Sequence, residues 1–397
     1  MAKSLIVVGA GVFGVSSALA WRRRYPDASV TLIDPKPLND KNPEGNWIVP
    51  TSEDTGKIIR TAYVSSSYTE LAKEAIGMWE VEEPYLKYWR KSGWVVPEKI
   101  EAGSLNKGTD MSRERFFELF PNALLEDDEI LKEDKSPGWV EASAALAATI
   151  QTAIREGVNY VPGEAAGLLW NVGTCIGVKL GDGTEFRADF VVLAMGCWTK
   201  DFLQQSGVTS HGVNCEVAGI TVLGIQLNER EYEQYKDMPM IAIPEKGEIL
   251  PPTRDGVIKT NNAISFHAPD LSSRKIPLIL PDNHPYFEEN IAMLAKYFPG
   301  LKHAPIAFRR YCFDAFTPKQ DFIISALPGY EGLHVATGGS FHGWKFLPNI
   351  GNYVADMLEG KLAADWVDKW AIGAKLSAEF IHPDIIPKRS AEITTQE

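Results

Sequence analysis

The sequence of 397 residues predicts an α/β domain around a parallel sheet, interrupted by an α+β domain with an antiparallel sheet. Three observations indicate this mixed fold class. An unbroken apolar run at residues 5–8 leads directly into a glycine-rich turn, and residues 333–339 repeat this arrangement near the other end of the chain. Between them, residues 215–324 contain short β-type runs separated by Pro and Gly, which is typical of an antiparallel sheet.

The opening strand and turn have the spacing of a dinucleotide-binding site. Gly9, Gly11 and Gly14 permit, in turn, a tight turn, a close approach of pyrophosphate to the backbone, and close packing of the next helix. A second predicted strand ends at Asp34, where a carboxylate can accept hydrogen bonds from a ribose. The alternative is a glycine-rich turn in another α/β fold. This Rossmann-type pattern predicts dinucleotide contacts at Gly9, Gly11, Val12, Phe13, Gly14 and Asp34.

The second glycine segment favours FAD over NAD, since both dinucleotides use the opening motif. Residues 333–339 are predicted as a strand and glycine loop, and residues 347–358 as a helix. A flavin needs hydrogen-bond donors where negative charge collects on reduction, and a helix N-terminus with a nearby cation supplies them. The other interpretation is a closing βα unit of the sheet. Further backbone contacts are expected at Gly196, Gly338, Gly339 and Gly343.

The predicted FAD-binding domain is discontinuous. It comprises residues 1–85, 136–214 and 325–397, and the inserted substrate domain comprises residues 86–135 and 215–324. Within the substrate domain, the acidic residues 125–134 are expected to form an exposed loop.

Composition and charge exclude several classes of partner. The net charge is −12 and the one basic run is Arg22-Arg-Arg24, expected at the solvated end of the first helix, so nucleic acid and anionic membranes are not expected partners. Four cysteines without CxxC or metal-ligand spacing predict no metal site and a reducing compartment. No signal peptide, membrane-length apolar run or Ser-Lys-Leu ending is visible, so we expect a cytoplasmic monomer.

Spaced motifs over nearly the whole chain resemble one flavoprotein group. Besides the opening glycines and Asp34, they are Thr55-Gly-Lys-Ile-Ile-Arg60, Gly256-Val-Ile-Lys259, the run from Arg310 to Ile324, and Phe341-His-Gly-Trp-Lys-Phe346. Together they resemble the monomeric sarcosine oxidase and fructosyl amino acid oxidase group of the D-amino-acid-oxidase-like FAD superfamily. The motif sequences most resemble those of the amadoriase, saccharopine and pipecolate oxidase branch.

The resemblance implies roles at the flavin for two buried candidates. Cys312 matches the cysteine that carries covalent FAD through a thioether to the 8α-methyl, and Arg309 or Arg310 is expected to lower the pKa of its thiol. The alternative is a small buried apolar residue. Lys259 matches the catalytic lysine that promotes reaction with oxygen by stabilising negative charge, whereas a solvated lysine at a strand end is the commoner role.

The resemblance also implies two cations for the substrate carboxylate, Arg60 and Lys345. Arginine can grip a carboxylate with two parallel bonds, while lysine acts as a point charge. An ion pair with an acidic residue of the chain is the alternative for Arg60. Lys57 stands where sarcosine oxidases carry Arg and fructosyl amine oxidases carry Lys, and we expect it at the flavin edge, positioning water or relaying a proton.

Three further residues are candidates for roles in or near the site. Glu53 lies near the place where sarcosine oxidases present His, and is expected either to bind a cationic or hydroxyl-bearing substrate tail or to be a solvated loop residue. The motif places His342 beside the flavin. For His267 a structural role on the surface or in the core is favoured over a role as a base.

The expected function is an FAD-dependent oxidase of an amino acid with a secondary (N-alkyl) amine. The product imine would hydrolyse or cyclise, and O₂ would be reduced to H₂O₂. The alternatives are a flavin dehydrogenase with another electron acceptor and a non-catalytic flavin-binding protein. The sequence leaves the substrate side chain and N-substituent open.

Overall fold

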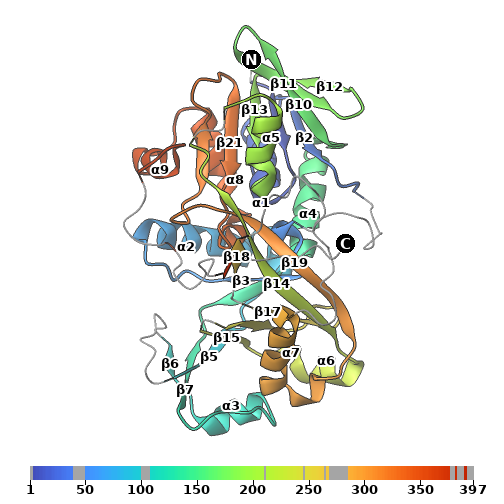
Figure 1. Ribbon diagram of the computed structural model, residues 1–397, viewed down its shortest axis with the longest axis vertical. Helices are drawn as coiled ribbons and strands as arrows, with labels where there is room; N and C mark the ends of the chain where they lie inside the picture. Colours follow the sequence, from blue (N-terminus) through green and yellow to red (C-terminus); the bar gives the residue numbers. More distant parts are fainter. Residues whose placement is uncertain are drawn as a thin grey trace.

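The structure, a computed structural model, describes residues 3–38, 50–99, 108–209, 212–244, 246–262, 265–267, 285–375, 381 and 389–390. Two large sheets organise it, one in the upper and one in the lower half of Figure 1. No helix in these ranges is both long and apolar enough to span a bilayer.

The upper sheet has six strands in the order β20-β21-β13-β1-β2-β9. Neighbouring strands are parallel except for β20, which pairs antiparallel with β21. The strand order brings the two predicted glycine segments into one sheet, because β13 lies between β1 and β21. The strand bounds are β1 Leu5–Val8, β2 Val30–Asp34, β9 Asn159–Pro162, β13 Phe190–Leu193, β20 Ile323–Ala326 and β21 Leu333–Thr337.

The lower sheet has ten strands and is mainly antiparallel. Its order is β22-β18-β14-β17-β16-β15-β5-β7-β6, and β19 also pairs with β14. The mixed fold class is therefore confirmed, while the domain bounds stay a prediction. The strand bounds are β5 Trp94–Lys99, β6 Thr109–Asp110, β7 Glu129–Asp134, β14 Glu216–Gln226, β15 Met240–Ile243, β16 Gly247–Leu250, β17 Val257–Asn262, β18 Phe266–His267, β19 Ile306–Phe316 and β22 Arg389–Ser390.

Two small sheets and a set of helices complete the described fold. Strands β3, β8 and β4 (Gly56–Ile59, Gly138–Glu141, Trp89–Arg90) form one small sheet, and β10, β11 and β12 (Ala165–Asn171, Thr174–Leu180, Glu185–Arg187) form the other. The helices are α1 Val12–Arg24, α2 Ser66–Val81, α3 Arg113–Leu119, α4 Ala142–Arg155, α5 Thr199–Gln205, α6 Glu229–Tyr235, α7 Pro285–Tyr297, α8 Ile350–Leu358 and α9 Ala364–Trp370. Helix α1 packs against both α4 and α8.

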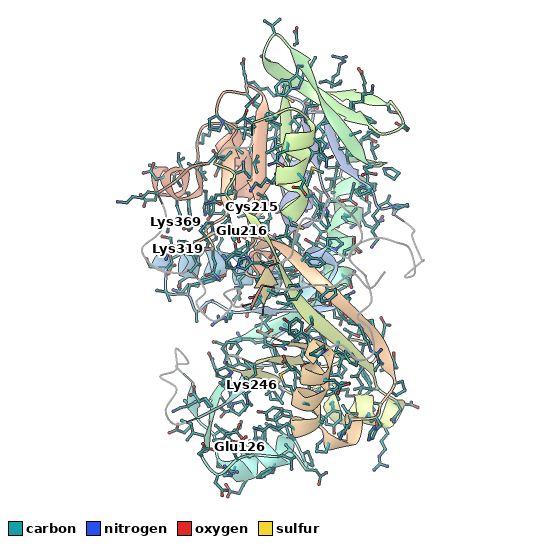
Figure 2. All side chains as sticks on the ribbon, viewed as in Figure 1. Glu126, Cys215, Glu216, Lys246, Lys319 and Lys369 are labelled. Carbon is teal, nitrogen blue, oxygen red and sulfur yellow. The ribbon has the colours of Figure 1, made fainter. Side chains whose placement is uncertain are left out.

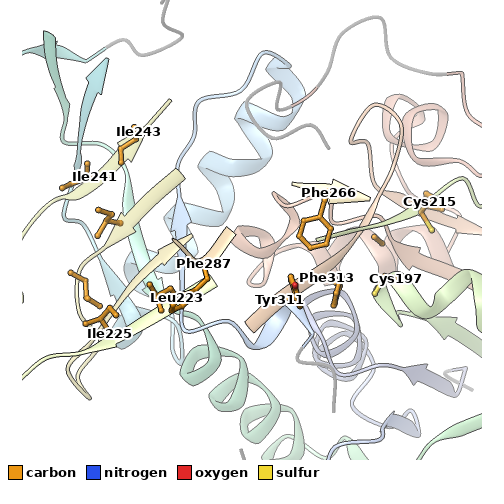
Figure 3. Close-up of a cluster of buried hydrophobic side chains, with 14 of the residues drawn as sticks. Cys197, Cys215, Leu223, Ile225, Ile241, Ile243, Phe266, Phe287, Tyr311 and Phe313 are labelled. Atoms are coloured by element: carbon orange, nitrogen blue, oxygen red, sulfur yellow. The ribbon is translucent and has the colours of Figure 1, made fainter. Parts of the chain in front are cut away.

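The long strands β14 and β19 connect the two halves of the molecule. They pair side by side over most of their length and run from the upper into the lower half of Figure 1. One buried hydrophobic cluster includes Leu193 of the upper sheet and Leu223 of the lower sheet. In Figure 3, Phe266 and Phe313 lie along this cluster, between Leu223 and Cys197. The two sheets therefore share a core, which fixes the residues that lie between them.

One surface expectation is wrong. The acidic stretch 125–134 contains strand β7, which pairs with β5, and Glu129 in it is buried beside Lys296 at 2.6 Å. The basic run lies in the last turn of α1, as expected, and Arg23 is exposed. There Arg23 pairs with Glu156 at 2.7 Å and Arg24 pairs with Asp356 at 2.6 Å.

Candidate functional site

The turn after β1 has the close backbone approaches that the glycine spacing predicts. Gly9 has φ +99°, and a Cβ atom added to Gly14 would lie 1.7 Å from the carbonyl oxygen of Gly9. The backbone N–H of Ala10 donates to Oδ2 of Asp34 at 2.8 Å, which places this carboxylate at the turn. Burial raises the pKa of Asp34. These residues fit the adenosine and pyrophosphate end of a dinucleotide, because only glycine leaves the necessary space at the N-terminus of α1.

The second glycine loop, after β21, adopts left-handed backbone at several positions. Gly338, Ser340 and Phe341 have φ values of +83°, +47° and +62°. The carboxylate of Asp314 holds this loop by accepting the N–H of Phe341 at 2.7 Å. Left-handed backbone is costly for Ser and Phe, so the loop depends on this support from β19.

The two glycine loops meet, as the FAD interpretation requires. A Cβ atom added to Gly343 would lie 3.2 Å from the ring of Phe13, which belongs to the first turn of α1. Farther along, the N–H of Gly351 donates to Oγ of Ser16 at 2.9 Å. Gly196 contacts the same region, since its carbonyl accepts the hydroxyl of Thr337 at 3.0 Å.

A buried carboxylate, Asp54, gathers three cations from separate elements. Its Oδ2 lies 2.9 Å from Nζ of Lys57 and 2.6 Å from Nζ of Lys259, and its Oδ1 lies 2.9 Å from Nη2 of Arg310. The Asp54 side chain is fully buried. Three positive groups around one carboxylate leave an excess of positive charge inside the protein, which can stabilise negative charge on a bound group.

The charged groups in this cluster shift one another's pKa values. Burial alone raises the pKa of Asp54, but Lys259, Lys57 and Arg310 hold it well below its ordinary value. Burial lowers the pKa of Lys259, and Asp54 opposes this effect. Burial acts in the same direction on Lys57, yet Asp54 and neighbouring acidic groups raise its pKa overall.

Cys312 lies on the same face of β19 as Arg310 and Asp314. Tyr311 and Phe313, which alternate with them, pack into the hydrophobic core instead. Burial raises the pKa of the Cys312 thiol, and Arg310 offsets only part of that increase. The expectation of a lowered thiol pKa is therefore wrong, because burial outweighs the neighbouring cations. Asp314 also lies in this group, and burial raises its pKa to about 6.

A second cationic group contains Lys345 and Arg60. Nζ of Lys345 donates to the hydroxyl oxygen of Tyr63 at 2.6 Å, and the Arg60 guanidinium lies 5.4 Å from the centre of the Trp94 ring. Burial and the charge of Arg60 lower the pKa of Lys345 well below its ordinary value. The structure therefore brings together the two cations predicted for a carboxylate.

His342 fixes the direction of a hydrogen-bond chain to Lys345. Its Nε2 lies 2.7 Å from the carbonyl oxygen of Gln320, which can only accept, so Nε2 carries the proton. Burial and the charge of Lys345 lower the pKa of His342 to about 3, so the ring is neutral. Its Nδ1 then accepts from the Tyr63 hydroxyl at 3.1 Å. His342 thus orients Tyr63, and Tyr63 orients Lys345.

Comparison with known proteins identifies the family. A family model described as DAO, FAD dependent oxidoreductase, matches residues 4–357. The chain is a DAO-family FAD-dependent oxidoreductase. Its curated relatives include L-saccharopine oxidase of Schizosaccharomyces pombe, 26% identical over 93% of each chain. They also include human peroxisomal sarcosine oxidase, 24% identical over 89% of this chain and 91% of the relative.

Solved structures share the fold of this oxidoreductase. Fructosyl peptide oxidase from E. terrenum superposes with a TM-score of 0.81 and 23% identity, covering 98% of this chain and 96% of that one. Amadoriase I from Aspergillus fumigatus gives a TM-score of 0.74 and 22% identity, covering 97% and 96%. At this identity the likeness shows the fold alone.

Two predicted candidates of the oxidoreductase lie away from the carboxylate cations. Glu53 forms an ion pair with Lys36, and its charge acts on nearby Asp34, so it lies on the adenosine side of the site. His267 is half-exposed and lies 2.8 Å from Glu216. Among the described residues, no group of three or more His, Cys, Asp and Glu side chains could hold a metal ion.

Sequence reasoning did not identify Asp54, Tyr63 or Asp314. Asp54 had one available signal, because it is an acidic residue three positions before Lys57 in the predicted functional loop. Asp314 had another, because it stands two residues after Cys312 in the motif that starts at Arg310, and residues two apart share a face wherever the chain forms a strand. Tyr63 carried no distinguishing pattern.

Proposed function

We propose that this FAD-dependent oxidoreductase is an oxidase of amino acids that contain a secondary amine. The observation that carries the proposal is that two buried lysines, Lys259 and Lys345, belong to two different cationic groups. Lys259, Lys57 and Arg310 surround Asp54, while Lys345 and Arg60 lie together at Tyr63 and Trp94. One group can hold a substrate carboxylate and the other can stabilise charge during oxidation.

Each group has a distinct role in this proposal. Bound FAD supplies the chemistry by accepting a hydride equivalent from the C–N unit and passing two electrons to oxygen. Arg60 and Lys345 bind the carboxylate and so orient the amine. Lys259 stabilises the negative charge that develops on oxygen, and Lys57 lies beside it, in position to hold water or a proton. The product imine leaves and hydrolyses or cyclises.

We infer that Cys312 would hold the FAD covalently, as a thioether between its Sγ and the flavin 8α-methyl carbon. Formation of this bond removes the thiol proton and one methyl C–H, and the two electrons released would pass through the flavin to oxygen. Its support is the position of Cys312 on β19, on the face shared with Arg310 and Asp314 and close to the Asp54 cluster. The raised pKa of the thiol means that the thiolate must form within the loaded site, where the neighbouring cations favour it.

The other residues around the flavin follow from the two glycine loops. We assign the adenosine and pyrophosphate end to Gly9, Gly11, Val12, Phe13, Gly14 and Asp34, and the ring end to Gly196, Gly338, Gly339, His342, Gly343 and Lys345. The curated relatives named for oxidation of saccharopine and sarcosine support an amine substrate. A monomeric, cytoplasmic enzyme stays a prediction of the sequence.

Anaerobic mixing of the purified flavoprotein with a panel of N-substituted amino acids tests the function. We expect at least one compound to bleach the flavin, and admission of air to restore its colour with stoichiometric H₂O₂. Bleaching without peroxide would establish a dehydrogenase instead. A panel that leaves the flavin fully oxidised would contradict the proposed function.

A further inference from the structure

One face of the lower sheet carries the polar residues of the site. Alternation along β17 directs Ile258 into the hydrophobic core and Lys259 to the opposite face, toward Asp54. In β16, Ile249 packs into that same core, whereas Leu250 packs with Trp94 in a separate small cluster. Residues that alternate with Ile258 and Ile249 therefore share the face of Lys259 and Trp94.

Glu248 and Asn261 are directly paired on this face. The register of β16 and β17 places Leu250 opposite Lys259 and Glu248 opposite Asn261. Both Glu248 and Asn261 thus point to the side of Lys259, since side chains of one register pair project to the same face. Glu248 is half-buried, and Asn261 is 7% exposed.

Asn261 and Glu248 both present unused acceptors. Oδ1 of Asn261 is buried without a hydrogen-bond partner among the described residues. Within the described ranges, the Glu248 carboxylate also has no hydrogen bond or ion pair. Its negative charge acts on Lys345 and partly opposes the lowering of the Lys345 pKa by burial. An unpartnered buried acceptor is costly, which points to a donor supplied by a ligand.

We propose that Glu248 and Asn261 form a subsite for a cationic group at the far end of the substrate. This rests on the proposed function, because it takes Arg60 and Lys345 as the site of the α-carboxylate. Two acceptors without an intervening donor match an ammonium group, which has three N–H donors and no acceptor. The substrate class is therefore an N-substituted amino acid whose side chain or N-substituent carries a positive charge.

The spacing fits a substrate of about the length of lysine. Trp94, which stacks on Arg60, belongs to β5, and β15 separates β5 from β16. Two strand spacings place Glu248 on the order of 10 Å from the Trp94 backbone, and both side chains project from the same face of the sheet. An extended aliphatic chain with a terminal ammonium spans such a gap.

The test compares Nα-methyl-L-lysine with Nα-methyl-L-norleucine, which has the same aliphatic chain without the terminal ammonium. The ratio of flavin-reduction rate to Kd, measured anaerobically in the holoenzyme, should favour the lysine compound by roughly 10- to 100-fold. Glu248→Gln should reduce this preference to about 3-fold or less, as expected for loss of a charged hydrogen bond. The ratio between the two compounds is the readout, because Glu248 also raises the pKa of Lys345 and its loss weakens carboxylate binding for both compounds alike. Asn261→Leu should reduce the preference for the lysine compound only in part.

A charge reversal and a distant control make the result specific. Glu248→Lys should invert the order of Nα-methyl-L-lysine and Nα-methyl-L-2-aminoadipate, because the latter carries a carboxylate at similar reach. Glu216→Gln should keep the wild-type preference, since Glu216 is an exposed residue that pairs with His267 and lies well away from the turn at Lys246 that precedes β16 (Figure 2).

Different results would contradict the Glu248–Asn261 subsite and the proposed oxidase function. The subsite is overturned if the lysine and norleucine compounds give the same ratio of flavin-reduction rate to Kd, or if the preference for the lysine compound survives Glu248→Gln. Either result leaves the proposed oxidase function intact. If neither compound reduces the flavin, calorimetric titration of L-lysine and L-norleucine decides: equal affinity, or no binding of either, also overturns it. Only a whole panel of N-substituted amino acids without reduction argues against the function itself.

Discussion

The Nζ atom of Lys259 donates a hydrogen bond to Oδ2 of Asp54 at 2.6 Å, and both side chains are almost fully buried. The residues are far apart in sequence, on β17 and in the loop before β3. Without a counter-charge, burial would favour the neutral form of Lys259. Asp54 therefore acts as a positioning residue that keeps Lys259 charged and fixed in place.

Replacing Asp54 should make the oxygen reaction sensitive to pH. In Asp54→Asn the pKa of Lys259 falls further, because burial is no longer opposed, and the protonated fraction is lost at lower pH than in the wild type. Stopped-flow reoxidation of the reduced flavin should slow as pH rises, starting from a lower pH in the variant. The fold should also lose about 3–5 kcal/mol, since buried Lys259 and the partly buried Lys57 and Arg310 lose their shared carboxylate partner.

The control for Asp54→Asn is Asp110→Asn, which changes an exposed carboxylate paired with Lys132. Its effect on stability should lie within about 1 kcal/mol, and its reoxidation profile should match the wild type. A reoxidation profile of Asp54→Asn that also matches the wild type would show that Asp54 does not govern the charge of Lys259.

Lys259→Met tests the role of the lysine directly. Reoxidation should slow on the order of 100-fold, the usual cost of removing one group that stabilises developing negative charge, while substrate reduction of the flavin changes much less. Separate stopped-flow measurement of the two half-reactions checks this. Lys246→Met, which removes an exposed lysine before β16, should alter neither half-reaction. Equal slowing of both by Lys259→Met would remove the assigned role.

The local part of the site could be predicted from the sequence, because short-range spacing determines it. Gly9, Gly11, Gly14 and Asp34 are constrained by one strand, one turn and the next strand, and the structure brings them together. The family resemblance located Lys259 and Lys345 as well. Pairing among these residues was not visible, since it depends on strands far apart in the chain.

Asp54 shows why the rest was missed. The sequence offers two adjacent acids, Glu53 and Asp54, with nothing local to distinguish them. Which of the two is buried depends on partners 205 and 256 residues away, Lys259 and Arg310. Strand β7 was missed for the same reason: its acidic residues look solvated until Lys296 is placed beside Glu129.

Lys345 should make substrate affinity depend on pH. Its pKa lies well below the ordinary value of lysine, so it loses its proton as pH rises, and its attraction for a carboxylate is present below that pKa and lost above it. The KM for a carboxylated substrate should therefore rise with pH. Lys345→Ala should raise KM roughly 10- to 100-fold at the low-pH end of the profile, where Lys345 is protonated, and flatten this dependence. An unchanged KM in Lys345→Ala would contradict carboxylate binding by Lys345. The control is Lys73→Ala, which removes an exposed lysine on α2 and should leave KM unchanged.

Acid precipitation tests the covalent bond. Yellow colour should remain with the precipitated wild-type protein and move entirely to the supernatant for Cys312→Ala. Cys175→Ala is the matched control, because Cys175 is also a buried free cysteine but lies on β11 of a small separate sheet. Wild-type protein whose colour is wholly released by acid would refute attachment at Cys312.

Asp314 should give the folded protein a distinct stability profile between pH 4 and pH 7. Burial raises its pKa to about 6 from an ordinary value of 3.8, so the folded state binds this proton more tightly than the unfolded state. The resulting stabilisation is complete below the unfolded pKa and is lost as pH rises through 6. Asp314→Asn cannot ionise, so relative to the wild type it should gain about 2.4 kcal/mol between pH 4 and pH 7.

Denaturant unfolding of Asp314→Asn and wild type at both pH values measures this difference. The amide can still accept the N–H of Phe341, and any weakening of that bond adds an offset that is the same at pH 4 and pH 7. Only the change in the difference between the two proteins therefore reports on ionisation. A constant difference would mean that Asp314 is already ionised at pH 4, and that Lys57 and the backbone donors of the glycine loop outweigh its burial.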